Sequence, residues 1–213
     1  MTDTAPRFRL DLFHLKVAAR SAIRTWAREE GRMSREIREL VVIDEEFLRH
    51  WLGVWMLARS NPTPYRRLLA SELGTVVRPA LIAAPEERLP ALVTDLARGL
   101  QTAGATRGLQ TSLVSKFAFS LRPEVIVPYD RRARQGLGEM FGRRLPDHDY
   151  PAYLAAFHRF AESFSAHLDE TGITTAMRDD WAPVMSERLF RMRAADKYFM
   201  LLGGFPVERM ARD

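Results

Sequence analysis

The sequence has no cysteine among its 213 residues, so disulfide bonds, thiolate zinc sites and four-cysteine iron–sulfur clusters are excluded. It also lacks long apolar runs: none has the length of a signal-peptide core, and none approaches the roughly 20 apolar residues of a membrane span. The histidines at 148, 158 and 167 are not spaced for joint metal binding on one helix. We therefore expect a cytoplasmic protein with no metal, no cofactor and no membrane association.

Lysine is scarce, with 3 Lys against 29 Arg, and the formal net charge is +5. Residues 98–145, the basic segment, hold nine basic and three acidic residues, a net of +6. Residues 146–180, the acidic segment, hold two basic and seven acidic residues, a net of −5. A basic segment of this kind attracts phosphate-bearing partners such as DNA. The alternative is that it pairs with the acidic segment inside the fold.

Most of the sequence has apolar residues at the spacing of an α-helix. Apolar residues recur every three or four positions in the first 30 residues, at Leu12, Leu15, Ala19, Ile23 and Trp26. This stripe predicts a helix over about 10–30, with Ser34 as the cap of the next one. The acidic triplet at 44–46 and the Thr63-Pro64 pair predict further helix starts.

The second half of the chain has the same periodicity. We predict helices over about 113–121, 129–141, 150–168 and 183–202. Residues 125–127 are the only strand-like triplet and are too short for a sheet. No repeat, linker or domain boundary is evident. The sequence therefore predicts an all-α fold, a single domain over 1–213 built as an irregular bundle of about eight or nine helices.

The segment from Gly108 to Leu137 has an unusual order of parts. A glycine turn leads to an apolar helix with one lysine, Lys116, and a Pro-containing connection then delivers Asp130 to the start of a basic helix. An acid at this position accepts hydrogen bonds from free backbone N–H groups and meets the helix dipole. Asp130 is therefore either a plain helix cap or a functional acid.

This segment resembles the helix–hairpin–helix DNA glycosylase superfamily. Residues 107–110, Arg-Gly-Leu-Gln, occupy the place of the family's hairpin, and residues 125–130, Val-Ile-Val-Pro-Tyr-Asp, match its apolar approach to an essential aspartate. The resemblance covers about 35 residues. It departs from the pattern at Gln110, where the family has a second glycine, and at Ser112, where the bifunctional members have their attacking lysine.

The resemblance implies base excision of the monofunctional kind, an N-glycosidic bond hydrolysis used in DNA repair. Asp130 would stabilise the developing sugar cation and orient water. Lys116 lies one helical turn beyond Ser112 and is the second candidate catalytic residue. A snorkelling surface lysine, or an internal ion pair with Asp130, is the alternative for Lys116.

Arginines near these residues are candidates for DNA contacts. We expect six residues to contact the DNA backbone and so to position the DNA: Arg107, Gly108, Ser112, Arg131, Arg132 and Arg134. The alternative for the three arginines of the basic helix is a solvated surface. A second basic ridge, Lys16, Arg20, Arg24 and Arg28, is interpreted as a surface stripe.

Two functions from different classes therefore stay open. One is a DNA-interacting protein related to the helix–hairpin–helix glycosylases, with Asp130 as the essential acid. The other is a non-catalytic helical module that binds a protein partner or nucleic acid. A helical enzyme acting on a small molecule is a third possibility that composition does not exclude.

Overall fold

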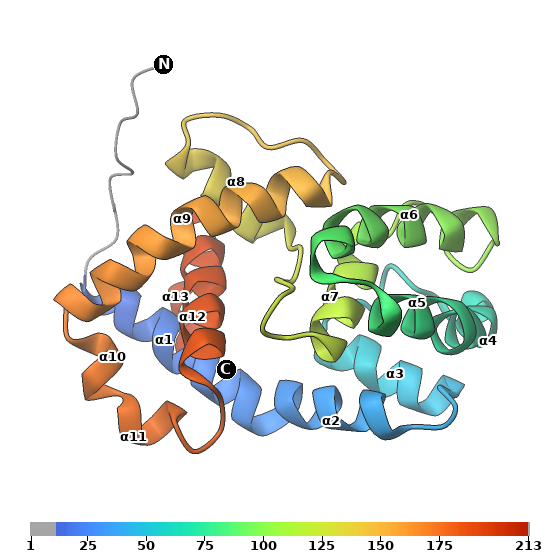
Figure 1. Ribbon diagram of the computed structural model, residues 1–213, viewed down its shortest axis with the longest axis horizontal. Helices are drawn as coiled ribbons and strands as arrows, with labels where there is room; N and C mark the ends of the chain where they lie inside the picture. The colour runs from blue at the N-terminus through green and yellow to red at the C-terminus, as the bar shows by residue number, and fades with distance from the viewer. Residues whose placement is uncertain (1–11, 213) are drawn as a thin grey trace. The chain divides into compact units, whose positions relative to one another are not determined.

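A computed structural model describes residues 12–212 (Figure 1), and no strand is present in this range. The predicted all-α fold is confirmed. The described range holds thirteen α-helices, nine of them with nine or more residues. The nine longer helices match the predicted eight or nine, and the additional elements are short. The N-terminal part of the predicted helix over 10–30 lies outside the described residues.

Contacts divide the chain into two compact units, and each is described by itself. Unit 1 comprises residues 1–28, 129–147 and 152–213, and unit 2 comprises 29–128 and 148–151. The expectation of a single domain stays a prediction, because the chain passes between the units several times and no linker segment separates them. In neither unit does the described chain contain a helix with the length and apolarity that crossing a membrane requires.

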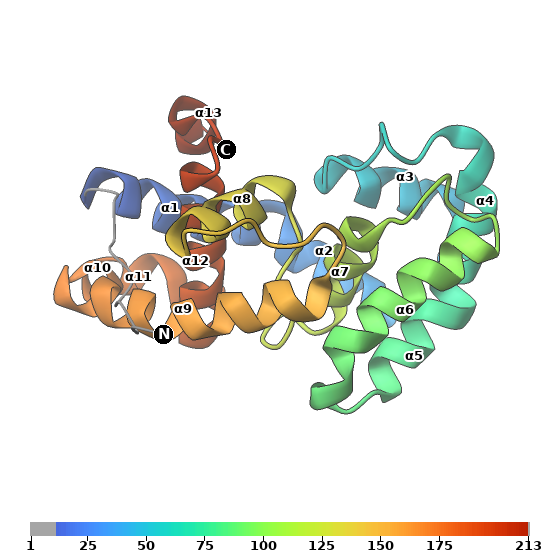
Figure 2. The ribbon, with the colours of Figure 1, turned by 90° about the horizontal axis from the view of Figure 1, so that it is seen from above.

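The helices of unit 1 are α1 (Leu12–Thr25), α8 (Arg131–Met140), α9 (Tyr150–Glu170, whose first two residues belong to unit 2), α10 (Ile173–Ala176), α11 (Arg178–Trp181), α12 (Glu187–Leu202) and α13 (Val207–Arg212). The centre of this unit is α12, which packs against α1 and α8 (Figures 1 and 2). From Leu189 to Leu201 most residues of α12 are buried, as expected of a helix at the centre of a unit.

Side chains of α9 and α12 interlock in the core of unit 1. The ring of Phe199 meets those of Phe157 and Phe160 edge to face, with centroid distances of 5.5 and 4.9 Å. Two charged residues of α12 are buried in this core, and the guanidinium of Arg193 donates to the carboxylate of Asp196 at 2.5 Å. The pairing offsets the cost of burying either charge.

Glycine permits the closest approach in unit 1. A Cβ at Gly136 of α8 would overlap the carbonyl oxygen of Phe199, and one at Gly203 would overlap that of Arg132. The backbones of α8 and the end of α12 therefore touch directly. The predicted start of α12 at Pro183 is wrong, since residues 182–184 form a turn and the hydroxyl of Ser186 caps the helix by accepting from the Leu189 N–H at 3.2 Å.

The helices of unit 2 are α2 (Gly31–Glu39), α3 (Glu45–Val54), α4 (Thr63–Glu72), α5 (Arg78–Ala83), α6 (Leu89–Thr102) and α7 (Thr111–Leu121). The centre of this unit is α7, which contacts α2, α5 and α6 and is buried throughout except at Ser112. The indole N–H of Trp51 donates to the hydroxyl of Ser120 at 3.2 Å, and its ring meets that of Phe117 edge to face.

Two helix starts differ in how well the sequence predicted them. The side chain of Asp44 accepts from the Phe47 N–H at 2.8 Å, so the predicted start at the acidic triplet is confirmed. The prediction that Ser34 caps a helix is wrong. Ser34 is buried inside α2 and donates to the carbonyl oxygen of Ser120 at 2.7 Å. The chain instead joins α1 to α2 through a π-helical turn over Trp26–Glu30, which the periodicity does not reveal.

The strand-like triplet at 125–127 does not pair with another strand in the described chain, as expected from its length. Within unit 2, the hydroxyl of Tyr150 both accepts from the Val127 N–H at 3.2 Å and donates to the Val127 carbonyl at 2.8 Å. One tyrosine thus satisfies the two backbone groups that a neighbouring strand would otherwise bind.

Candidate nucleic-acid interface

Asp130 is the N-cap of α8. Its backbone is extended, and its carboxylate accepts from the N–H of Arg132 at 2.8 Å. The side chain is half-buried, so part of it reaches the surface of unit 1. The cap interpretation is confirmed, while the catalytic role stays a prediction.

Arg131 and Arg132 follow in the first turn of α8. Arg131 is exposed. Arg132 is half-buried, since one nitrogen of its guanidinium donates to the carbonyl of Gly204 and the group lies 5.5 Å from the ring centroid of Phe205. Arg131 is therefore the side chain of this turn that is freely presented to a phosphate, and Arg132 also joins α8 to the end of α12.

Arg134 is buried, with 7% of its surface exposed, and its charge is directed inward. Its guanidinium donates to the carbonyl of Leu145 at 2.6 Å and forms an ion pair with Asp147. Both partners lie in residues 141–147, the loop after α8. Arg134 thus fixes this loop along the helix, and the predicted pairing of the basic with the acidic segment is confirmed for Asp147.

The loop presents two further arginines, Arg143 and Arg144, which are exposed. Arg144 forms an ion pair with Asp147 at 2.8 Å. Gly142 adopts a left-handed conformation, with φ 62°, that glycine tolerates best, and a Cβ at Gly138 would lie 2.8 Å from the Arg143 carbonyl. Both arginines belong to the basic segment, but they were not predicted as site residues. The Gly-Arg-Arg run was the signal that could have indicated them.

A surface pocket with a volume of about 690 Å³ opens between α8 and this loop. Its polar lining includes Gln135, Glu139, Arg143 and Arg144, and the side chain of Arg134 also lines it. Residues 130–147 contain five arginines and three acids, a net charge of +2. Positive charge and a concave surface therefore coincide on this part of unit 1.

Lys116 lies in unit 2 and is buried, with 7% of its surface exposed, so the surface-lysine alternative is wrong. Its ammonium donates to the carbonyl of Trp55 at 3.3 Å and lies 5.9 Å from the centroid of the Trp55 ring. Trp55 is the C-cap residue of α3, where a cation is favoured by the helix dipole. These contacts tie Lys116 to the end of α3, while its catalytic role stays a prediction.

The remaining predicted DNA-contacting residues also belong to unit 2. Arg107 is exposed in the bend before α7, while Gly108 and Ser112 are half-buried. A Cβ at Gly108 would meet no atom within 4 Å, so the fold of this unit does not require glycine there. The eight predicted site residues divide equally, with Asp130, Arg131, Arg132 and Arg134 in unit 1 and Arg107, Gly108, Ser112 and Lys116 in unit 2.

The second basic ridge follows α1 and the π-turn in unit 1. Lys16, Arg20 and Arg28 are exposed, and Arg24 is half-buried and donates to the carbonyl of Met210 at 3.1 Å. The interpretation of these residues as a surface stripe therefore holds for three of the four, and Arg24 connects α1 to α13.

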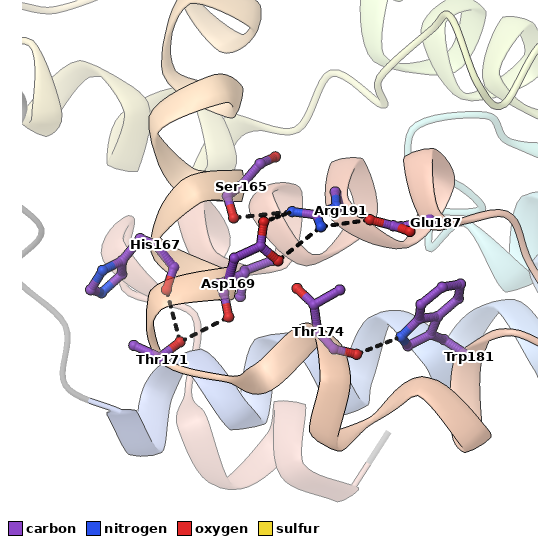
Figure 3. Close-up of polar contacts among 9 residues, drawn as sticks. Ser165, His167, Asp169, Thr171, Thr174, Trp181, Glu187 and Arg191 are labelled. Carbon is purple, nitrogen blue, oxygen red and sulfur yellow. Dashed lines mark hydrogen bonds and ion pairs between the residues drawn. The ribbon is translucent and has the colours of Figure 1, made fainter.

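A polar cluster around Arg191 joins the end of α9 to the start of α12 (Figure 3). The guanidinium of Arg191 binds both carboxylate oxygens of Asp169, at 2.8 and 2.9 Å, and also Glu187 at 2.5 Å. Hydrogen bonds from Arg191 lower the pKa of Asp169. Nearby, partial burial and the charge of Arg188 lower the pKa of His158. Since the guanidinium of Arg191 is engaged by two carboxylates from α9 and α12, we interpret this cluster as a structural tie.

The described chain contains no group of three or more side chains that could hold a metal ion. No family model matches this chain, and neither the curated proteins nor the solved structures contain a match. The resemblance to the helix–hairpin–helix glycosylases therefore stays a prediction that rests on the sequence segment alone.

Proposed function

We propose that this protein binds DNA through the phosphate backbone, using the surface of unit 1 formed by α8 and residues 141–147. The observation that carries the proposal is the group of exposed arginines at 131, 143 and 144; the loop that contains the last two is fixed along α8 by the buried Arg134. Guanidinium groups suit phosphate oxygens because their N–H groups form a rigid fork. Contacts of this kind position a protein on DNA without reading its sequence.

Binding of fluorescently labelled duplex and single-stranded DNA across a salt series tests this function. Each phosphate that a protein neutralises contributes about −0.9 to the slope of log affinity against log salt. Three exposed arginines lead us to expect a slope of about −2 to −3. Absence of binding at low salt would overturn the proposal and favour the protein-partner alternative.

Base excision is a second candidate function, and the position of Asp130 favours it. Its carboxylate is half-buried at the N-terminus of α8, directly before the exposed Arg131. Such a carboxylate can stabilise a sugar cation when a nucleotide has left the stack. Burial of Lys116 against Trp55 favours the monofunctional chemistry, in which no lysine attacks the sugar.

The variant Asp130→Asn separates catalysis from binding. Asparagine also caps helices, so the variant retains α8. Loss of base release from damaged or modified DNA, with DNA affinity retained, supports excision. Base release at the wild-type rate excludes Asp130 as the essential acid, and DNA binding without any base release by the wild-type protein leaves the binding function alone.

A further inference from the structure

The pocket between α8 and residues 141–147 has properties that backbone contacts to duplex DNA do not require. Its volume of about 690 Å³ lies within the range of sites for small organic ligands. Gly138 and Gly142 in its wall have no side chains to fill it. A ligand the size of one nucleotide therefore fits beside the helix.

The cations around this pocket favour an anion inside it. Arg143 and Arg144 line it and are exposed, and Arg144 would have to exchange its surface ion pair with Asp147 for the ligand. Arg134 lines it as well, and in the described chain its buried Nε has no hydrogen-bond partner, although its other two nitrogens are engaged. A buried donor without an acceptor is destabilising. Because this Nε is itself buried, a ligand in the pocket is attracted by the charge of the guanidinium and does not bond to the Nε.

The neutral and acidic side chains of the pocket favour an organic phosphate over phosphate alone. Gln135 and Glu139 are four residues apart on α8, so both lie on the same exposed side of the helix. An amide and a carboxylate at this spacing can bind the hydroxyl groups of a sugar or the N–H groups of a base. Inorganic phosphate would gain nothing from Glu139, which repels it.

Two guanidinium groups favour the doubly charged terminal phosphate over an internal diester, which has one charge and a chain on both sides. We propose that this pocket binds a nucleoside monophosphate group, held by Arg143 and Arg144 and oriented by Gln135 and Glu139. The group is carried either by a free nucleotide or by the 5′-phosphorylated end of a DNA strand. Binding of a DNA end rests on the proposed DNA-binding function, whereas binding of a free nucleotide does not.

The test compares ligands that differ in one phosphate. Calorimetric titration with nucleoside 5′-monophosphates uses the corresponding nucleosides and inorganic phosphate as controls. Anisotropy compares a single-stranded oligonucleotide that has a 5′-phosphate with the same strand that has a 5′-hydroxyl. The variant Arg143→Gln/Arg144→Gln removes two exposed guanidinium groups, and the control Arg178→Gln removes one exposed guanidinium group at the start of α11, outside the pocket lining.

The proposal predicts that the monophosphate binds and the nucleoside does not. If the source is a DNA end, the 5′-phosphorylated strand binds about tenfold more tightly than the 5′-hydroxyl strand, as expected for a charge-assisted hydrogen-bond pair. Both preferences disappear in the double variant and persist in Arg178→Gln. Equal affinity for both strands, together with no nucleotide binding, overturns the pocket while salt-dependent duplex binding would still support the proposed function. Nucleotide binding without any DNA binding would support the pocket and overturn the proposed DNA-binding function.

Discussion

Lys116 in unit 2 and Arg134 in unit 1 are buried to the same extent, but the groups that they contact differ. Each has 7% of its surface exposed and donates to a backbone carbonyl, of Trp55 and of Leu145 respectively. Lys116 ends in the apolar core of its unit, over an indole ring. Arg134 ends beside a surface loop and also pairs with Asp147, whose side chain is 49% exposed. Burial alone therefore does not separate a core residue from one that shapes a binding surface, whereas the position of its partners does.

The largest effect is expected where the backbones of unit 1 touch. A Cβ in Gly136→Ala would overlap the Phe199 carbonyl oxygen, and α8 would have to move away from α12. We expect a loss of about 3 kcal/mol in the free energy of unfolding, at the upper end for overpacked sites. Chemical denaturation measures the loss, and hydrogen exchange shows whether it falls in unit 1.

The control is Gly99→Ala on α6 of unit 2, where a Cβ meets nothing within 4 Å. Alanine is the better helix former, so this variant should be more stable by about 0.5–1 kcal/mol. Equal effects of the two substitutions would contradict the close contact of α8 with α12.

Lys116→Met tests the buried cation of unit 2. Methionine has similar length but cannot donate to the Trp55 carbonyl at the end of α3, so we expect a loss of about 2 kcal/mol in the free energy of unfolding. DNA affinity should be unchanged when measured at a temperature where the variant is folded. A variant that keeps its stability but loses DNA binding would support Lys116 as a site residue and contradict a purely structural role.

Arg134→Met tests the cation of unit 1. The half-exposed Asp147 can be solvated after the substitution, but the Leu145 carbonyl loses its donor, so the expected loss of stability is about 2 kcal/mol, as for Lys116→Met. Residues 141–147 lose their fixed position along α8, and DNA affinity should fall severalfold. The result that contradicts this account is an unchanged DNA affinity, which would mean that the loop needs no clamp.

The smallest expected effect is the pH dependence of the stability contributed by the ion pair of Arg191 and Asp169, which joins α9 to α12. Hydrogen bonds from Arg191 lower the pKa of Asp169, so the pair stabilises the fold above the ordinary pKa of an aspartate, and this contribution is lost as the pH falls through the lowered value. Because Asp169 is largely exposed, a few tenths of a kcal/mol are expected.

Arg191→Gln should therefore reduce stability more near pH 7 than at a pH below both values of the Asp169 pKa, where only the hydrogen bond of Arg191 to the Ser165 carbonyl is lost. Denaturation curves of both proteins at several pH values measure the difference. A difference that stays constant with pH would show that the ion pair is not its source.

Local patterns in the sequence predicted most of the helices, the start of α3 and the cap of α8. Asp44 and Asp130 accept hydrogen bonds from backbone N–H groups two or three residues away, and such contacts depend only on neighbouring residues. The sequence did not predict the π-turn over 26–30, because a change of helical register there keeps the apolar stripe intact. That turn is why Ser34, expected as a cap, lies inside α2 instead.

The candidate site was predictable only in part, because some of its side chains depend on partners that are not their neighbours in the sequence. The positive charge of the segment can be counted, and Arg131 is exposed as a phosphate contact requires. The burial of Arg134 depends on Leu145 and Asp147, and that of Lys116 depends on Trp55, 61 residues away. Tertiary partners such as these leave no trace in periodicity or charge.

Whether exposed arginines beside α8 bind DNA phosphates is shown by the salt dependence of duplex binding, measured for the wild-type protein and for Arg143→Gln/Arg144→Gln. Each lost phosphate contact should reduce the magnitude of the slope by about 1. We predict a slope of about −2 to −3 for the wild type and near −1 for the double variant, with Arg178→Gln unchanged. Identical slopes for wild type and double variant would contradict the claim and place the DNA contact, if there is one, elsewhere.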